Sequence, residues 1–99
     1  MWWAELPPPA GRRPVLLLSR DEAYPVRSLV TVAPITTRIR GIPVEVPLST
    51  EDGLPRPCVV NLDSIVTIAK AHLKEHIAPL SRQKMKAAER SLRFALELE

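Results

Sequence analysis

The sequence lacks the residue patterns on which several common protein classes depend. Its one cysteine, Cys58, cannot form an internal disulfide and has no second cysteine for a metal cluster. Its three glycines, Gly11, Gly41 and Gly53, are isolated, so each is best explained as a turn residue. No glycine-rich nucleotide loop and no Gly-x-Ser-x-Gly elbow is present. These absences argue against an ATPase, a dehydrogenase or an α/β hydrolase.

Long apolar runs are also missing. Apolar residues make up 45% of the 99 residues, yet no run reaches the roughly 18 residues of a membrane span. The N-terminus has no basic segment leading into a long apolar stretch, so we expect no signal peptide and a cytoplasmic protein. At this length we expect one domain, residues 1–99, whose small core would benefit from association with a second chain.

Positive charge is in modest excess and unevenly distributed. Lys and Arg number 14 against 11 acids, for a formal charge of +3. Every basic residue before position 60 is an arginine, and all lysines lie from Lys70 onward. Because the planar guanidinium group matches phosphate oxygens in a bidentate way, this distribution fits a phosphate-binding first half. A genome that prefers arginine codons would produce the same distribution, so charge alone leaves both explanations open.

Proline divides the chain into two zones. Ten of the 11 prolines and all 3 glycines lie in residues 1–57, which predicts short strands separated by turns. The expected strands are 1–6, 14–19 (buried on both faces), 28–36 (with Pro34 at an edge or bulge), 44–48 (alternating, so half exposed), and 58–62 and 64–68 (a further pair or one long bent strand). Strands at this spacing indicate a small closed barrel.

The last third of the sequence favours helix. Residues 69–76 could form a short helix and 77–80 an extended piece, and Ser81 is a good N-cap for a terminal helix that begins at Arg82. Three-to-four spacing predicts an apolar stripe that packs on the barrel, formed by Met85, Ala88, Leu92, Ala95 and Leu96. His72 and His76 would share a helix face, but no zinc-helix motif surrounds them. We therefore expect two solvated histidines and no bound metal.

Arginine and threonine side chains gather at strand boundaries. Arg12 and Arg13 lie between a loop and an apolar strand, and Pro14 restricts Arg13 to extended geometry. Thr36 and Thr37 end another strand and are followed by two more arginines. Hydroxyl and guanidinium donors could stabilise a phosphodiester transition state, whose extra charge spreads over non-bridging oxygens. The same residues could instead be β-formers and solubilising charges at a sheet edge.

Five segments resemble the MazF/PemK family of toxin–antitoxin ribonucleases, in the family's order and over nearly the whole chain. They are residues 2–7, 11–21 with its Arg-Pro-Val strand, 32–41 with the position of the active-site hydroxyl, 52–63 as a hairpin, and 92–98 in the terminal helix. The resemblance implies a mainly β, α+β fold with a C-terminal helix. It also implies an SH3-like small antiparallel barrel, shared with the CcdB toxins, and a homodimer.

The resemblance also implies a reaction, the cleavage of RNA. Family members cleave single-stranded RNA without a metal or cofactor, through attack by the RNA's own 2′-hydroxyl that leaves a 2′,3′-cyclic phosphate and a 5′-hydroxyl. Arg13 and Thr36 match the family's essential pair. Because a guanidinium group stays protonated, Arg13 is a poor general base, and we expect it to stabilise the transition state and to be able to donate a proton. Thr36 would bond the scissile phosphate, and the base is not identified.

RNA contacts and partners follow from the same resemblance. The residues expected to bind RNA are Gly11, Arg12, Ser19, Thr37, Arg38, Arg40, Asp63 and Ser64. A cognate antitoxin with a disordered, acidic tail would cover Arg13 and so relieve the inhibition of translation and growth. The family's usual Arg-Gly-Asp start is missing and the first loop is compact and proline-rich, which leaves the cleavage sequence open.

Two other functions are compatible with such a barrel. A non-enzymatic toxin could inhibit a protein target such as gyrase, as CcdB does, through its C-terminal residues. It would then tolerate the loss of Arg13. A plain SH3-like binding module would need an aromatic groove, and the four aromatic residues, Trp2, Trp3, Tyr24 and Phe94, are too few for one. The combination of Arg13 and Thr36 favours the ribonuclease.

Overall fold

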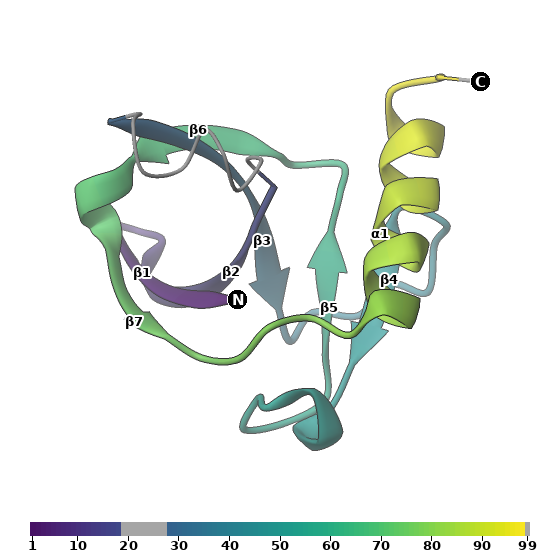
Figure 1. Ribbon diagram of the computed structural model, residues 1–99, viewed down its shortest axis with the longest axis horizontal. Coiled ribbons are helices and arrows are strands. Elements are labelled where there is room, and N and C mark those ends of the chain that lie inside the picture. Colours follow the sequence, from purple (N-terminus) through teal and green to yellow (C-terminus); the bar gives the residue numbers. More distant parts are fainter. Residues whose placement is uncertain (19–27, 99) are drawn as a thin grey trace.

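The chain folds into a strongly curved antiparallel sheet, followed by a helix at the C-terminus of the chain (Figure 1). The computed structural model describes residues 1–18 and 28–98. Its elements are β1 (Trp2–Leu6), β2 (Gly11–Leu17), β3 (Leu29–Thr36), β4 (Glu45–Leu48), the 3-10 turn η1 (Thr50–Asp52), β5 (Cys58–Asn61), β6 (Val66–Ala69), the 3-10 turn η2 (Lys70–His72), β7 (Leu73–His76) and α1 (Arg82–Ala95). The predicted fold class, mainly β with a terminal helix, is confirmed.

Strand β3 organises the sheet, whose order is β4-β5-β3-β2-β1-β7 with β6 also on β3. One edge of β3 pairs with β2. The other edge pairs with β6 along Leu29–Val32 and with β5 at Ile35 and Thr36. In Figure 1, β1, β2, β3, β6 and β7 curve into a ring, while β4 and β5 extend from it toward α1. This ring is the small barrel expected from the strand spacing.

Two details of the strands differ from the prediction: the pairing of residues 58–68 and the place of Pro34. Residues 58–62 and 64–68 do not pair with each other, because β5 and β6 follow one another along the same edge of β3. The alternative of one long bent path is therefore nearer to the structure. Pro34 lies between these two pairings, so its missing N–H group falls where β3 changes partner rather than at the end of the strand.

The two faces of β2 and β3 enter two different hydrophobic clusters. On one face, Val15 and Val32 pack with Ala4 and Val30 inside the ring. On the other face, Leu16 packs in a cluster that contains residues of β3, β4, β5 and α1. Both Val15 and Leu16 are buried, at 0% and 2% exposure. The prediction that this apolar run is buried on both faces is confirmed.

The segment before α1 is a strand where helix was expected. Residues 70–72 form a single 3-10 turn, and Leu73–His76 pair as β7 with β1, so the predicted helix over 69–76 is wrong. Long-range pairing with the unmatched edge of β1 overrides the local helical preference. His72 and His76 therefore do not share a helix face. The His76 and Trp2 rings form a T-shaped pair with their centroids 5.1 Å apart.

Helix α1 begins as predicted. The Ser81 hydroxyl caps it by accepting a hydrogen bond from the Lys84 amide at 3.2 Å. Ala88 is buried against the sheet, with Met85 and Leu92 packed beside it. The predicted stripe is wrong at its end, because α1 stops at Ala95 and Leu96 is 49% exposed. No helix in residues 1–18 and 28–98 has the length and apolar character needed to cross a bilayer.

Candidate functional site

Strand register gathers the candidate side chains on one face of the sheet. Val15 lies opposite Pro34 in the antiparallel ladder of β2 and β3. Arg13 comes two residues before Val15, and Thr36 comes two residues after Pro34. Because residues two apart on a strand point to the same side, Arg13 and Thr36 share a face just beyond the last pair of this ladder. Thr36 pairs with Val59, two residues before Asn61. The partner of Asn61 in β4 is Glu45, which continues this face across four strands.

A groove of about 430 Å³ opens on this face. It is lined by Arg13, Pro34, Thr36, Arg38, Arg40, Glu45, Asn61 and Ser64. Three guanidinium groups thus face a single carboxylate, which makes the groove a favourable place for an anionic ligand. The structure brings together Arg13 and Thr36, the pair expected to do the chemistry, along with three of the residues expected to bind RNA.

Arg13 is held by the strand and by the loop before it. Its backbone pairs with Ala4 of β1, and its side chain is half-buried. The Nε atom donates a hydrogen bond to the carbonyl oxygen of Ala10 at 3.2 Å. The loop that includes Pro7 and Ala10 closes on itself through a bond from the Ala10 amide to the Pro7 carbonyl at 3.1 Å. This anchoring fixes the guanidinium group at the groove and leaves its terminal nitrogens to meet a ligand.

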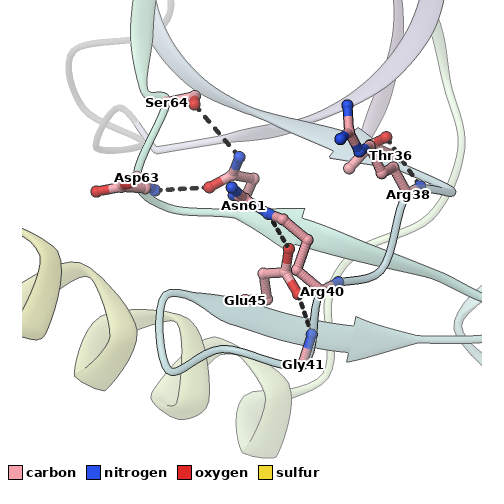
Figure 2. Close-up of polar contacts among 8 residues, drawn as sticks. All are labelled: Thr36, Arg38, Arg40, Gly41, Glu45, Asn61, Asp63 and Ser64. Atoms are coloured by element: carbon pink, nitrogen blue, oxygen red, sulfur yellow. Dashed lines mark hydrogen bonds and ion pairs between the residues drawn. The ribbon is translucent and has the colours of Figure 1, made fainter.

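Thr36 is the last residue of β3, and its hydroxyl is oriented by the chain that follows it. The Oγ1 atom accepts a hydrogen bond from the Arg38 amide at 3.1 Å (Figure 2). A hydroxyl has one hydrogen to donate and two lone pairs. Because the amide occupies a lone pair, the hydroxyl hydrogen stays available for an anionic oxygen in the groove.

Glu45 is a groove residue whose burial the sequence pattern did not predict. Alternation in 44–48 predicts a half-exposed strand, and Glu45 does point away from the Val46 side, but its own side chain is only 2% exposed. The chain of residues 40–42 covers it. One carboxylate oxygen accepts from the amides of Arg40 and Gly41, each at 2.9 Å, and the other accepts from Arg40 Nε at 3.3 Å (Figure 2). The two arginines shortly before an acid, Arg38 and Arg40, were the signal that could have found this pairing.

These contacts shift the acidity of Glu45. Burial by itself raises the pKa of the carboxyl. The hydrogen bonds from the amide and side chain of Arg40 and from the amides of Gly41 and Ile42 together outweigh burial and hold the pKa below its ordinary value of 4.5. The ionised form therefore stabilises the fold at neutral pH. This contribution is present above about pH 4.5 and is lost as the pH falls through the lowered pKa of the folded state.

A pH-dependent difference in stability follows for Glu45→Gln. We expect the free energy of unfolding of the wild type to exceed that of the variant at pH 7, and the gap to narrow below pH 4.5 as Glu45 takes up a proton. Urea unfolding of both proteins at pH 7, 4.5 and 3 measures the gap and cancels the titration of the other acids. A gap that stays constant over this range would contradict the expectation.

Asn61 is a second residue that the prediction missed. Its Oδ1 atom accepts from the Asp63 amide at 2.9 Å, and its Nδ2 atom donates to the Ser64 hydroxyl at 3.3 Å (Figure 2). An asparagine that bonds the amide two residues later forms an Asx turn, which the Asn-Leu-Asp order could have indicated. This turn carries Ser64 into the groove and leaves Asp63 outside the lining.

The remaining predicted RNA-binding residues lie outside the groove lining. Arg12 points to the opposite side from Arg13, 4.9 Å from the Trp3 ring and 3.1 Å from the Glu75 carboxylate. Thr37 lines a separate pocket of about 200 Å³. Gly11 begins β2 with a positive φ of 63°. Ser19 lies outside the described residues.

Groups of three or more His, Cys, Asp or Glu side chains that could hold a metal ion are absent from the part of the chain that the structure describes. Cys58, the one cysteine, is buried. Burial, together with the nearby charge of Asp52, raises the pKa of its thiol. We therefore assign no ligand or nucleophile role to this residue.

Known proteins match this chain over nearly its full length. The family model described as PemK-like, MazF-like toxin of type II toxin–antitoxin system matches residues 1–96. The chain is 41% identical over 98 residues to the probable endoribonuclease MazF5 of Mycobacterium tuberculosis, covering 98% of this chain and 89% of that protein. It is 39% identical over 87 residues to the endoribonuclease MazF3 of the same species, covering 88% and 84%.

Solved structures agree. The Mycobacterium tuberculosis toxin MazF-mt6 superposes with a TM-score of 0.92 at 37% identity, over 99% of this chain and 96% of that one. A mycobacterial endoribonuclease in complex with its cognate antitoxin superposes with a TM-score of 0.86 at 26% identity, over 99% and 91%. Sequence, family model and fold lead to the same conclusion: the chain belongs to the PemK-like, MazF-like toxin family of type II toxin–antitoxin systems.

Proposed function

We propose that this chain, as a single domain spanning residues 1–99, is a cytoplasmic endoribonuclease toxin that cleaves single-stranded RNA. The observation that carries the proposal is the groove that joins Arg13 and Thr36 on one face, with Arg38 and Arg40 beside them. Relatives named endoribonucleases at 34–41% identity over most of the chain support it. Cleavage of cellular RNA would stop translation and growth.

The groove suits a reaction in which RNA supplies its own nucleophile. The 2′-hydroxyl gives up its proton to a base that we assign to no residue, and its oxygen forms a bond to the adjacent phosphorus. The bond to the 5′-oxygen breaks, that oxygen takes up a proton, and the products are a 2′,3′-cyclic phosphate and a 5′-hydroxyl. A protein then has only to align the reacting atoms and stabilise the charge on the phosphate. Arg13 would stabilise that charge and donate a proton to the leaving oxygen, and the Thr36 hydroxyl would bond a non-bridging oxygen.

RNA would lie along the groove on either side of this pair. Arg38 and Arg40 offer charge to phosphates, which attracts RNA without regard to sequence. Ser64 presents a hydroxyl that can read an unpaired base edge, because single-stranded RNA exposes those edges. We retain Gly11, Arg12, Thr37 and Asp63 as flanking contacts, outside the groove lining.

Two partners complete the proposal. A mycobacterial relative has been solved in complex with its cognate antitoxin. We propose that a cognate antitoxin neutralises this chain too, with an acidic segment that follows the three arginines of the groove. We also propose a homodimer, in which a second copy adds to the small core that 99 residues can build.

The experiment that tests the function is incubation of total cellular RNA with the purified protein in the presence of EDTA. We expect cuts at a short recurring sequence, mapped by sequencing the new 5′ ends. The new ends should carry a 5′-hydroxyl and a 2′,3′-cyclic phosphate. Intact RNA after long incubation at high protein concentration would overturn the proposal, and cleavage only after a divalent metal is added would overturn its chemistry.

Replacing Thr36 by valine removes the hydroxyl while keeping the shape of the side chain. We expect cleavage to fall roughly 10- to 100-fold, the effect of losing one hydrogen bond to a charged group. Thr37→Val is the matched comparison, because Thr37 is exposed and lines a different pocket. Single-turnover cleavage of an RNA that contains the mapped site measures both variants. Equal losses for the two would refute the assignment of Thr36.

A further inference from the structure

The carboxylate of Glu45 is the one acid among the residues that line the described groove. An acid in a basic groove has two obvious interpretations. It could be the general base that takes the proton from the 2′-hydroxyl, or a charge that simply weakens RNA binding. The contacts of Glu45 argue against both interpretations.

A general base needs an oxygen that is free to accept a proton. Both oxygens of Glu45 are occupied: one accepts from the amides of Arg40 and Gly41, and the other accepts from Arg40 Nε. The side chain is 2% exposed, and these bonds hold the pKa of the carboxyl below its ordinary value. A buried carboxylate with lowered basicity, whose two oxygens already accept three hydrogen bonds, is a poor proton acceptor at neutral pH.

The same contacts orient Arg40. Glu45 accepts hydrogen bonds from the backbone amide and from the Nε atom of Arg40. The backbone and the Nε atom of Arg40 are therefore both fixed relative to β4. The Arg40 side chain is 47% exposed, and its Nε is bound on the Glu45 side, which directs the rest of the guanidinium fork toward the groove that both residues line (Figure 2). A fork held in this way loses little rotational freedom when it binds a phosphate.

We propose that Glu45 is a positioning residue, which holds the Arg40 guanidinium group in place to bind a phosphate of the RNA. This inference rests on the proposed ribonuclease function and names a residue that acts through another. Its effect is on binding rather than on the chemical step, because the reacting phosphate is assigned to Arg13 and Thr36.

Glu45→Gln is the decisive variant, because it separates the two kinds of contact. The glutamine oxygen can still accept from the amides of Arg40 and Gly41, so the turn and the fold are kept. Its NH2 group then faces Arg40 Nε, donor against donor, and releases the guanidinium group. Simple electrostatics predicts tighter RNA binding when an acid leaves a basic groove. The positioning role predicts the opposite sign.

The probe is an RNA that contains the cleavage site mapped for the wild type, with a 2′-deoxy nucleotide at that site so that it binds without being cut. We expect Glu45→Gln to weaken its binding about tenfold, the effect of one lost charge-assisted contact, in fluorescence anisotropy. The slope of log K against log salt should fall by about 0.7, one phosphate contact. With the cleavable RNA, KM should rise while kcat stays within about twofold.

Arg40→Ala and the double variant test whether Glu45 acts through Arg40. Arg40→Ala should match the loss of affinity and of salt slope, and adding Glu45→Gln to it should change neither further. Glu89→Gln is the matched control, because Glu89 is an exposed acid on α1 outside the groove, and it should bind as the wild type does.

Each other outcome overturns the inference in a recognisable way. Tighter binding by Glu45→Gln would show a merely repulsive charge, and additive losses in the double variant would show a role independent of Arg40. A fall in kcat with the acidic limb of its pH profile removed would make Glu45 the base. Failure of the wild type to bind or cut RNA would overturn the proposed function together with this inference. Normal cleavage by the wild type with an unaffected Glu45→Gln variant would overturn this inference alone.

Discussion

Arg13→Ala should lose cleavage by at least about 100-fold while the protein stays folded. The expected size is that of removing one preorganised donor from a site where charge develops in the transition state. Arg13 is half-buried, but its side chain makes its one described bond to a loop carbonyl, so truncation should disturb the core little. Single-turnover cleavage of the mapped RNA gives the rate, and thermal unfolding confirms the fold.

The neighbouring arginine provides the matched comparison. Arg12→Ala removes the same side chain one residue earlier, on the face that meets Trp3 and Glu75. We expect a loss of less than about tenfold, because Arg12 can offer charge to RNA only at the margin of the groove. Arg13→Lys keeps the charge but removes the planar, bidentate guanidinium group, so its cleavage rate should stay well below that of the wild type. Equal activity of the Arg12 and Arg13 variants would contradict the assignment and would favour a non-enzymatic toxin.

Leu16→Ala should lower the free energy of unfolding by about 2–5 kcal/mol, the usual effect of truncating a fully buried leucine. Leu16 is 2% exposed and contacts the cluster that joins the sheet to α1. For a domain of this size, that loss is a large share of the total stability. Urea unfolding followed by tryptophan fluorescence or circular dichroism measures it.

Leu96→Ala is the control for this loss. It makes the same chemical change at a leucine that the helical spacing places in the core but the structure leaves 49% exposed. We expect a change within about 0.5 kcal/mol. A loss comparable to that of Leu16→Ala in the isolated chain would mean that the end of α1 is packed, and would restore the stripe expected from the sequence.

The residues that local patterns could locate are those at strand boundaries. A proline directly after Arg13 restricts its backbone, and hydroxyl residues end the β-branched run at Thr36. Arg13 and Thr36 could therefore be assigned to strand boundaries from the sequence alone. Period-two alternation also separates Arg12 from Arg13, although the sequence interpretation grouped them together. The assignments of Arg13 to catalysis and of Arg12 to RNA binding stay predictions.

Long-range contacts decide the residues that sequence could not place. Residues 73–76 have helical preferences, but the open edge of β1 pairs them as a strand. Alternation assigns Glu45 a side of its strand correctly, yet it cannot tell that residues 40–42 will fold over that side. Leu96 follows the helical period, but α1 ends at Ala95, one residue before it.

The alternation of β2 and β3 between two hydrophobic clusters has a consequence for quality control. A slip of one residue in this ladder would turn Val15 and Leu16 to each other's side and would carry Arg13 away from the groove. A chain with that error would lose the proposed catalytic pair, since the register that packs the interior also places Arg13 and Thr36 on one face. We therefore expect a misassembled copy of the chain to lack ribonuclease activity.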